Sequence, residues 1–276
     1  MAGRQSNLSR YLIRAMLAAG CACLAILLAA AIRARANTRT YVTTYRLVAD
    51  QRQVIPQMLG ESARIVEARV RILARNYALR AWKVETEPED RIGITFRTQL
   101  HPAEALDWTT MTGRAALCLV HPDASILEAE DPEDLPAEYH VKVYNELRYS
   151  LSRPGEMRRY KQEYLICKEP LMRVKRFAAV DFATVGLKKE TVLTFKFDEE
   201  QGNQFEDLTA TNVGRQMAML IDGELFFPPS QIGSAVAGGT VQVRGYFYNP
   251  PLRKLVKMLN AGTLSGRLEK VSQTVE

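Results

Sequence analysis

The sequence has few of the residues that most often carry metal or acid-base chemistry: three histidines and four cysteines among 276 residues. His101, His121 and His140 are isolated, without an H-x-x-x-H or C-x-x-C pattern, so we expect no zinc site. The G-x-S-x-G, Walker and G-x-G-x-x-G motifs are also missing. The glycine-rich stretch 233–239 lacks the Lys-Ser/Thr pair of a phosphate-binding loop and is interpreted as a connector. We therefore predict a protein without catalytic residues, cofactor or bound metal.

The sequence also lacks a basic excess outside its N-terminal end. The formal net charge is +6, but five of the 37 basic residues fall within the first 36 positions, which contain no acidic residue. The rest of the chain carries 32 basic and 31 acidic residues. Because no basic face or RNA-binding aromatic motif is visible, we expect no nucleic-acid partner.

One long apolar run is present, and it lies at the N-terminus. Residues 15–32 contain no charge, and the run extends to 11–33 if the flanking arginines reach the interface. A single-pass membrane anchor within residues 1–36 is the favoured interpretation. The A-x-A pattern at 34–36 leaves a cleaved signal peptide open, and 18–21 faintly resembles a lipoprotein box. Basic residues on both sides of the run are balanced, so they do not fix its orientation.

Residues 37–121 show the pattern of a β-α-β-β-α-β unit. A helix beginning near Pro56 has one apolar face, and an acidic turn at 87–90 separates two alternating strands. This order predicts an α+β domain with a ferredoxin-like, split βαβ base. The expected elements are strand 41–48, the helix from 56, strands 82–85 and 92–96, a helix at 102–112, and strand 115–120.

An acidic, proline-rich segment at 122–138 is typical of an exposed linker. The D-x-[DN]-x-[DN]-G spacing of a calcium loop is missing there and at 198–202. Beyond the linker, strands are expected at 141–149 and 160–167, with a turn at 153–155. Basic and aromatic residues in these strands form either a recognition surface or the solvated side of a sheet: Arg148, Tyr149, Arg158, Arg159 and Tyr160.

The segment 191–247 specifies a compact β-α-β-β unit in detail. Residues 191–197 alternate as a strand, Asp198 can cap a short helix, and an Asn-Val-Gly sequence at 212–214 can end it. The apolar run 217–221, followed by Asp222-Gly223, predicts a hairpin with the strand at 225–227. After Pro228-Pro229 and a loop rich in small residues, 240–247 reads as another strand.

This arrangement resembles the head part of the first periplasmic domain of SecD, the accessory subunit of the bacterial preprotein translocase. Two further segments are similar to the same family: 119–122 and the leucine-rich stretch 255–262. Together the resemblance spans most of residues 54–271. The family-motif positions, interpreted as structural, are Phe197, Asp198, Gly202, Phe205, Leu208, Thr209, Asn212, Gly214, Asp222, Gly223, Pro229, Gly238, Gly239, Gly245 and Phe247.

The resemblance implies an N-terminal transmembrane helix (1–36), a base (37–121), a linker (122–138), a head (139–248), and a return helix and strand completing the base (249–276). It further implies a non-enzymatic module in the bacterial inner membrane, with its large domain on the periplasmic side. The expected partners are translocating or unfolded polypeptide and translocase subunits.

Two departures from the SecD pattern are visible. The Gly-Leu-Asp-Leu-x-Gly-Gly motif expected after the anchor is replaced by residues 37–41, and no second apolar segment of spanning length follows. We therefore expect a module without the proton-coupled membrane bundle. A scaffolding subunit of another envelope complex that uses the same fold remains an alternative, as does a hydrolase assembled from scattered residues.

The two cysteines outside the apolar run leave two interpretations open. Cys118 and Cys167 each fall in an expected strand, and a disulfide is permitted outside the cytoplasm. Two buried free thiols are the other interpretation, because nothing in the sequence places the two strands side by side.

Overall fold

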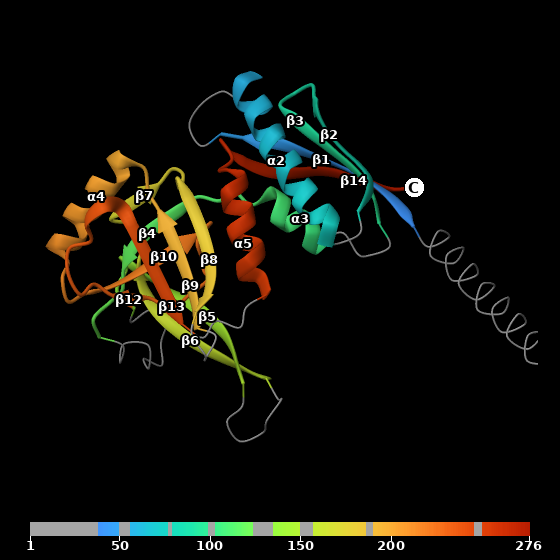
Figure 1. The fold of residues 1–276 in the computed structure, drawn as a ribbon. Coiled ribbons are helices and arrows are strands. Elements are labelled where there is room, and N and C mark those ends of the chain that lie inside the picture. The colour runs from blue at the N-terminus through green and yellow to red at the C-terminus, as the bar shows by residue number, and fades with distance from the viewer. Residues whose placement is uncertain are drawn as a thin grey trace, which may run out of the picture.

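The computed structural model describes residues 38–49, 56–76, 79–98, 103–123, 135–149, 157–185, 190–245 and 250–276 (Figure 1). The interpretations of residues 1–36 as a tail and anchor, of 153–155 as a turn, and of Phe247 as a motif position lie outside this part of the chain. Within it, no helix combines the length and the apolar character needed to cross a membrane.

A four-stranded antiparallel sheet, here called the base sheet, is built from both ends of the described chain. Its order is β14 (Arg267–Val275), β1 (Arg39–Val48), β3 (Arg91–Thr98) and β2 (Arg80–Glu87). The expected strands at 41–48, 82–85 and 92–96, and the turn between the last two, are confirmed. β14 joins this sheet through eight paired positions with β1, so residues more than 200 positions apart in the chain lie side by side.

Two helices cover one face of the base sheet, α2 (Pro56–Asn76) and α3 (Ala103–Thr110). α2 forms because its apolar positions recur every three or four residues, which places Val66, Val70 and Leu73 on a single buried stripe. Glu67 and Arg71 pair on the opposite, exposed side at 3.0 Å. The expected helix from Pro56 is therefore confirmed.

The expected place of strand 115–120 is wrong. β4 (Ala115–Leu119) forms where predicted, but it pairs with β10 (Gln216–Ile221) and β7 (Met172–Val174) in a second sheet, and β14 is the fourth base strand. The physical reason is that β4 is buried on both of its faces. An apolar run of five residues has no polar side that would assign it to one sheet, so distant pairing partners decide its position.

The second sheet has the order β11 (Glu224–Leu225), β10, β4 and β7, and β12 (Ser230–Gln231) also pairs with β10. A third sheet has the order β13 (Thr240–Gly245), β9 (Glu190–Lys196) and β8 (Ala179–Val185). The two sheets share one core with α4 (Glu199–Thr211) and α5 (Pro250–Ala261). Aromatic rings fill its centre, with Phe177, Phe195, Phe197 and Phe205 in contact at centroid distances of 5.1 to 5.7 Å.

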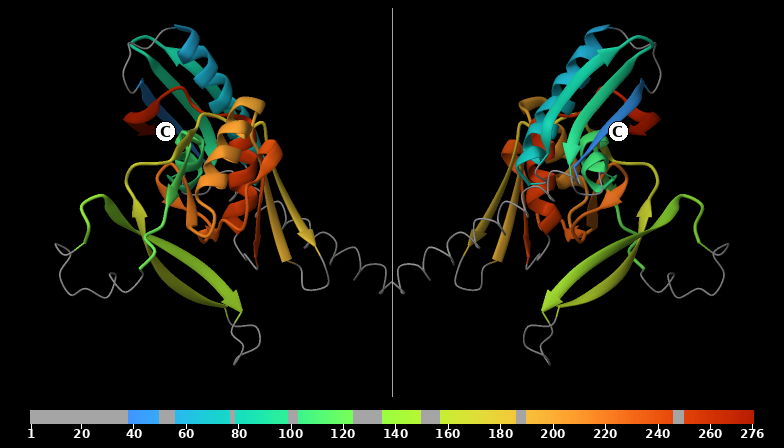
Figure 2. Two further views of the ribbon diagram at one scale, coloured as in Figure 1. Left: turned by 90° about the vertical axis from the view of Figure 1, so that its left-hand side faces the viewer. Right: turned by 90° about the vertical axis from the view of Figure 1, so that its right-hand side faces the viewer.

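A long two-stranded ribbon of β5 (Tyr139–Tyr149) and β6 (Met157–Cys167) projects from this body, as both views in Figure 2 show. A two-stranded hairpin alone is marginally stable in water, so its attachment matters. Its base packs on the second face of β4 and β10, where Tyr144 and Ile166 are buried against Cys118 and Val120. A bridge between Val120 and Ile166 joins β6 to the end of β4.

The start of α4 depends on a single side chain. Asp198 has an extended backbone, and its carboxylate accepts a 2.9 Å hydrogen bond from the Gln201 N–H. The acceptor satisfies one of the N–H groups that every helix leaves unpaired at its first turn.

We expect Asp198→Ala to lower the free energy of unfolding by about 1 kcal/mol, because the first turn loses its cap. Urea denaturation followed by far-UV circular dichroism measures this change. Asp198→Ser retains an acceptor and should recover most of the loss, while Asp207→Ala removes the same charge from an exposed position of α4 as a matched control. An equal loss for Asp198→Ala and Asp207→Ala would show that charge, not capping, is responsible.

α5 lies between the base sheet and the head, the part of the chain built from the second and third sheets, α4 and the ribbon (Figure 1). Leu252, Leu255, Val256 and Leu259 pack into the head core, while Met258 contacts Leu73 of α2. Near its end, the Asn260 amide accepts from the Val180 N–H at 3.0 Å and donates to the Val180 carbonyl at 2.6 Å. The helix therefore contacts both parts.

Candidate functional site

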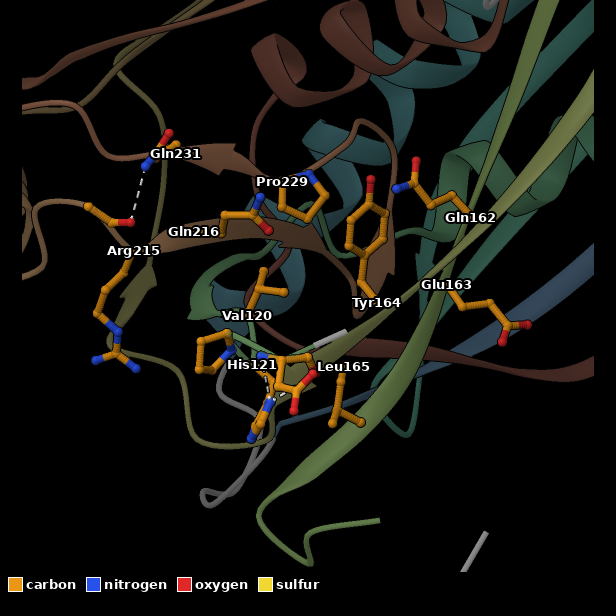
Figure 3. A pocket seen from close by; sticks show the side chains of 13 residues that line it. Val120, His121, Gln162, Glu163, Tyr164, Leu165, Arg215, Gln216, Pro229 and Gln231 are labelled. Atoms are coloured by element: carbon orange, nitrogen blue, oxygen red, sulfur yellow. Dashed lines mark hydrogen bonds between the residues drawn. The ribbon is translucent and has the colours of Figure 1, made fainter. Parts of the chain in front are cut away.

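A pocket of about 520 Å³ opens in the head where the end of β4, β6 and the start of β10 meet (Figure 3). One wall is the β6 segment 162–165, and the opposite wall comes from 214–216 and the loop leading into β12. The segment 120–123 forms its floor. The lining residues are Val120, His121, Pro122, Asp123, Gln162, Glu163, Tyr164, Leu165, Gly214, Arg215, Gln216, Pro229 and Gln231.

The floor of the pocket is the place where β4 stops pairing. The Val120 N–H donates to the Gln216 carbonyl at 3.0 Å, and the His121 N–H donates to the Leu165 carbonyl at 2.8 Å. Pro122 then interrupts the strand, since it has no N–H to donate. The chain then turns, and the Asp123 N–H donates a hydrogen bond to the His121 Nδ1 atom at 3.1 Å. This turn directs the chain away from β6.

The wall formed by 214–216 is fixed by a loop that needs a glycine. Gly214 has a φ of +86°, a left-handed conformation that glycine adopts without strain. Its N–H donates to the Ile232 carbonyl at 2.8 Å, and the Ile232 N–H donates to the Arg215 carbonyl at 2.9 Å. Arg215 therefore has a fixed backbone at the rim, and its guanidinium donates to the Asn212 side chain at 3.2 Å.

The pocket has both polar and apolar lining and carries charges of both signs. Arg215 stands on one side and Glu163 on the other (Figure 3), and Asp123 also lines the pocket. Glu163 is also paired with Lys161 at 2.5 Å on the exposed side of β6. Amide side chains supply much of the remaining lining, so the site offers donors and acceptors to a ligand of mixed polarity.

Burial shifts the pKa values of two side chains, Cys118 and His140, toward the neutral form. Burial raises the pKa of the Cys118 thiol to about 11, and the nearby Cys167 adds to this. Both thiols are free, as the second interpretation expected, but only Cys118 is buried and Cys167 is partly exposed. Burial also lowers the pKa of His140, as do Lys142 and Lys168. Among the described residues, no group of three or more His, Cys, Asp or Glu side chains could hold a metal ion.

The motif positions singled out in the sequence separate into three groups. Gly214 and Pro229 line the pocket, as do His121 and Pro122 from the segment 119–122. Phe197, Phe205 and Thr209 are buried in the head core, with Leu208 packed partly against it. Of the remaining described positions, five lie in turns and caps: Asp198, Asn212, Asp222, Gly223 and Gly238. Gly202 of α4 lies against Gly239, and Gly245 is the last residue of β13.

Sequence reasoning did not identify the β6 wall of the pocket or the three polar residues opposite it. The β6 strand was expected, but nothing in the sequence indicated that 162–165 would face Arg215, Gln216 and Gln231. Arg215 and Gln216 directly follow the Asn-Val-Gly sequence at 212–214, and this position was the only sequence signal that pointed to them. His121 lies at the end of β4, directly after the bridge between Val120 and Ile166.

The family model described as "SecDF, P1 head subdomain" matches residues 150–265. That range includes β6, the whole third sheet, α4, β10 and α5, and therefore most of the pocket wall. Residues 150–265 are therefore similar to a SecDF P1 head subdomain. The recognition of the chain as SecD-like from the segment 191–247 is confirmed.

Several SecD proteins are similar in sequence over part of the chain. The protein translocase subunit SecD of Acidaminococcus fermentans is 37% identical over 82 residues, which cover 30% of this chain and 19% of that protein. SecD of Calditerrivibrio nitroreducens is 35% identical over 75 residues, covering 27% and 14%. SecD of Rickettsia felis is 24% identical over 119 residues, covering 43% and 23%. The matched region thus spans less than a quarter of each of these relatives.

Solved structures of SecDF share the fold. A crystal structure of SecDF in the super-membrane-facing form superposes with a TM-score of 0.55 and 17% identity, covering 86% of this chain and 30% of that one. A second structure, from work describing SecDF as a membrane component that enhances protein export, gives a TM-score of 0.52 at 17% identity. It covers 85% of this chain and 98% of the other. The α+β fold of a SecDF periplasmic domain therefore extends beyond the head to the base sheet.

Proposed function

We propose that this chain is a non-enzymatic, SecD-like module for protein export, whose head contacts translocating polypeptide at the pocket between β4, β6 and β10. The observation that carries the proposal is the SecDF head match over residues 150–265, which includes the β6 and β10 walls of the pocket. The lining also fits the role. Amide, carboxylate and guanidinium groups on facing walls can bind the main chain of many different sequences, as an export client requires.

The base serves as a ferredoxin-like platform for the head. The order β14-β1-β3-β2, with every neighbour antiparallel and two helices on one face, is the arrangement that a split βαβ unit adopts. Its fourth strand is supplied from the C-terminal side of the head. A platform of this kind supports the head by two chain connections, one entering and one leaving.

The module is placed at the membrane by the apolar run at 11–33, with the base and head on the periplasmic side. This placement is supported by the length of the run and by the membrane description of the SecDF relative. Translocase subunits are the second class of partner, because the similar SecD proteins are translocase subunits by name.

Photocrosslinking from the pocket tests the proposed contact with polypeptide. A photoreactive phenylalanine derivative in place of Gln162 should crosslink to a translocating preprotein during secretion, because Gln162 lines the pocket and is exposed. The same derivative in place of Gln57, an exposed position of α2 in the base, is the matched control and should give little product. Crosslinks from Gln162 only to non-translocase envelope proteins would favour the scaffolding alternative and contradict an export role.

A further inference from the structure

Within the described part of the chain, β6 has one main-chain edge at the wall of the pocket that is only partly paired. On one side β6 pairs with β5 along all eleven of its residues. On the other side, the Leu165 carbonyl accepts a hydrogen bond from the His121 N–H, and Ile166 forms a β-bridge with Val120. Among the described residues, no main-chain hydrogen bond continues this second ladder toward Glu163 and Lys161.

The direction of the free groups follows from strand geometry. The N–H and C=O groups of one residue point to the same side of a strand, and successive residues alternate between sides. Because the Leu165 carbonyl points away from β5 toward β4, the main-chain groups of Glu163 and Lys161 point the same way. Both residues are exposed, and their side chains pair with each other at 2.5 Å.

The end of β4 explains why the ladder stops. In a continued strand, the Asp123 N–H would reach the Glu163 carbonyl, two positions beyond the contact between His121 and Leu165. It donates instead to the His121 Nδ1 atom, and Pro122 turns the chain away. The place in line with β4 and beside Glu163 is therefore not taken by β4 itself.

We propose that an extended polypeptide segment pairs as an added antiparallel strand with the free edge of β6 at Lys161 and Glu163, in line with β4. This inference rests on the proposed function for the identity of its ligand, a polypeptide chain in translocation. Two features of the site favour such a ligand. Main-chain pairing accepts any sequence without proline at the paired positions, and the neighbouring pocket can receive side chains of different polarity.

The side chains of the added strand would alternate between two environments. Those that share a face with Gln162 and Tyr164 would lie beside these residues at the pocket wall, since cross-strand neighbours on one face are in contact. Those on the other face would lie beside the Lys161 and Glu163 pair, which offers one charge of each sign. Neither face demands one particular residue type.

Two variants at one position separate main-chain pairing from side-chain contact. Glu163→Pro removes the N–H that points to the free edge and leaves the bonds to β5 intact, because those come from the neighbouring residues. Glu163→Ala removes the same carboxylate and keeps the N–H. The probe is a fluorescein-labelled ten-residue peptide of alternating threonine and valine, and binding to the full chain in detergent is measured by fluorescence anisotropy.

We expect Glu163→Pro to raise the Kd of the peptide about tenfold, because the peptide loses its hydrogen bond with the main-chain N–H of residue 163. Glu163→Ala keeps this N–H and should change the Kd less than about twofold. On the unaltered chain, added peptide should also slow hydrogen exchange at the Glu163 amide, which is a readout independent of any variant's folding.

Unchanged binding by Glu163→Pro together with unchanged exchange at Glu163 would overturn the strand pairing, while crosslinks from Gln162 would leave the proposed function standing. Failure of the unaltered chain to bind the peptide, together with loss of the Gln162 crosslinks, would overturn both. Self-association that Glu163→Pro abolishes would assign this edge to a second copy of the chain and overturn the polypeptide ligand.

Discussion

Replacing Arg69 by methionine is expected to lower the free energy of unfolding by about 3 to 5 kcal/mol, the range for removing one member of a buried charged network. Arg69 lies on α2 and is fully buried. Its guanidinium donates to three main-chain carbonyls: Thr109 at 3.1 Å, Gly262 at 2.6 Å, and Met111. Methionine keeps much of the side-chain volume, so the loss comes mainly from the carbonyls left without a donor.

These carbonyls lie where the chain passes between the base and the head. Thr109 and Met111 are at the end of α3, just before the chain enters β4, and Gly262 follows α5, just before the chain returns to β14. On the head side, Asp222 accepts from the N–H groups of Gly113 at 3.1 Å and Arg114 at 3.0 Å. One arginine therefore holds both connections together.

Burial lowers the pKa of Arg69 to about 10, and the charge of Asp222 opposes this. The guanidinium therefore remains charged at neutral pH, and its bonds to the carbonyls are charge-assisted. Arg69→Lys should recover only part of the stability, since an ammonium group cannot reproduce the planar fork that reaches carbonyls from two segments.

Urea denaturation of the full chain measures this effect, with Arg71→Met as the matched control. Arg71 lies on the same helix with its side chain 67% exposed, where it pairs with Glu67 and lies over the Trp82 ring at 5.9 Å. Its replacement should therefore cost no more than about 1 kcal/mol relative to the unaltered chain. Similar midpoints for Arg69→Met and the unaltered chain would show that the two connections do not depend on Arg69.

Replacing Gly239 by alanine is expected to cost about 3 kcal/mol, and the cause is a close approach of two backbones. Gly239 has a φ of +59°, and a Cβ there would lie 2.7 Å from the Cα of Gly202 in α4. Alanine would combine a left-handed backbone, at about 1 to 2 kcal/mol, with overpacking that forces α4 outward, at about 1 to 3 kcal/mol. The Gly239 carbonyl also accepts from the Phe197 N–H at 2.8 Å, so the residue cannot move freely.

Thermal unfolding of the head, followed by near-UV circular dichroism of its aromatic cluster, measures the effect of Gly239→Ala. Gly233→Ala is the matched control in the same loop, because no atom lies within 4 Å of its added Cβ and its φ is not left-handed. A midpoint for Gly239→Ala equal to that of Gly233→Ala would mean that α4 can shift away from residue 239 without loss.

The elements of the head could be predicted because their signals are local. The Asp198 cap, the Asp222-Gly223 turn and the paired glycines before β13 each depend on neighbours within a few residues, and each occurs as expected. Asp222 and Gly223 both have a positive φ, as a tight two-residue hairpin turn requires. Such cap and turn signals can be recognised in the sequence without knowing how the rest of the chain folds.

The pocket could be predicted only in part. The sequence singled out Gly214, Pro229 and His121, but it did not indicate that these residues line one pocket. β6 reaches them through a bridge between Val120 and Ile166, which are 46 positions apart and are joined by pairing, not by the local sequence. Long-range pairing of apolar strands leaves little local signal.

The sequence by itself determined the positions of the helices and of many strands, the caps and turns, and the resemblance of residues 191–247 to a SecD head. Only the tertiary structure decided which strands share a sheet, that β4 belongs to the second sheet and not to the base, and that β6 forms a wall of the pocket. The physical reason is the difference between local and distant interactions. Turns, caps and amphipathic periods are encoded within a few residues, whereas sheet membership depends on partners that burial selects across the whole chain.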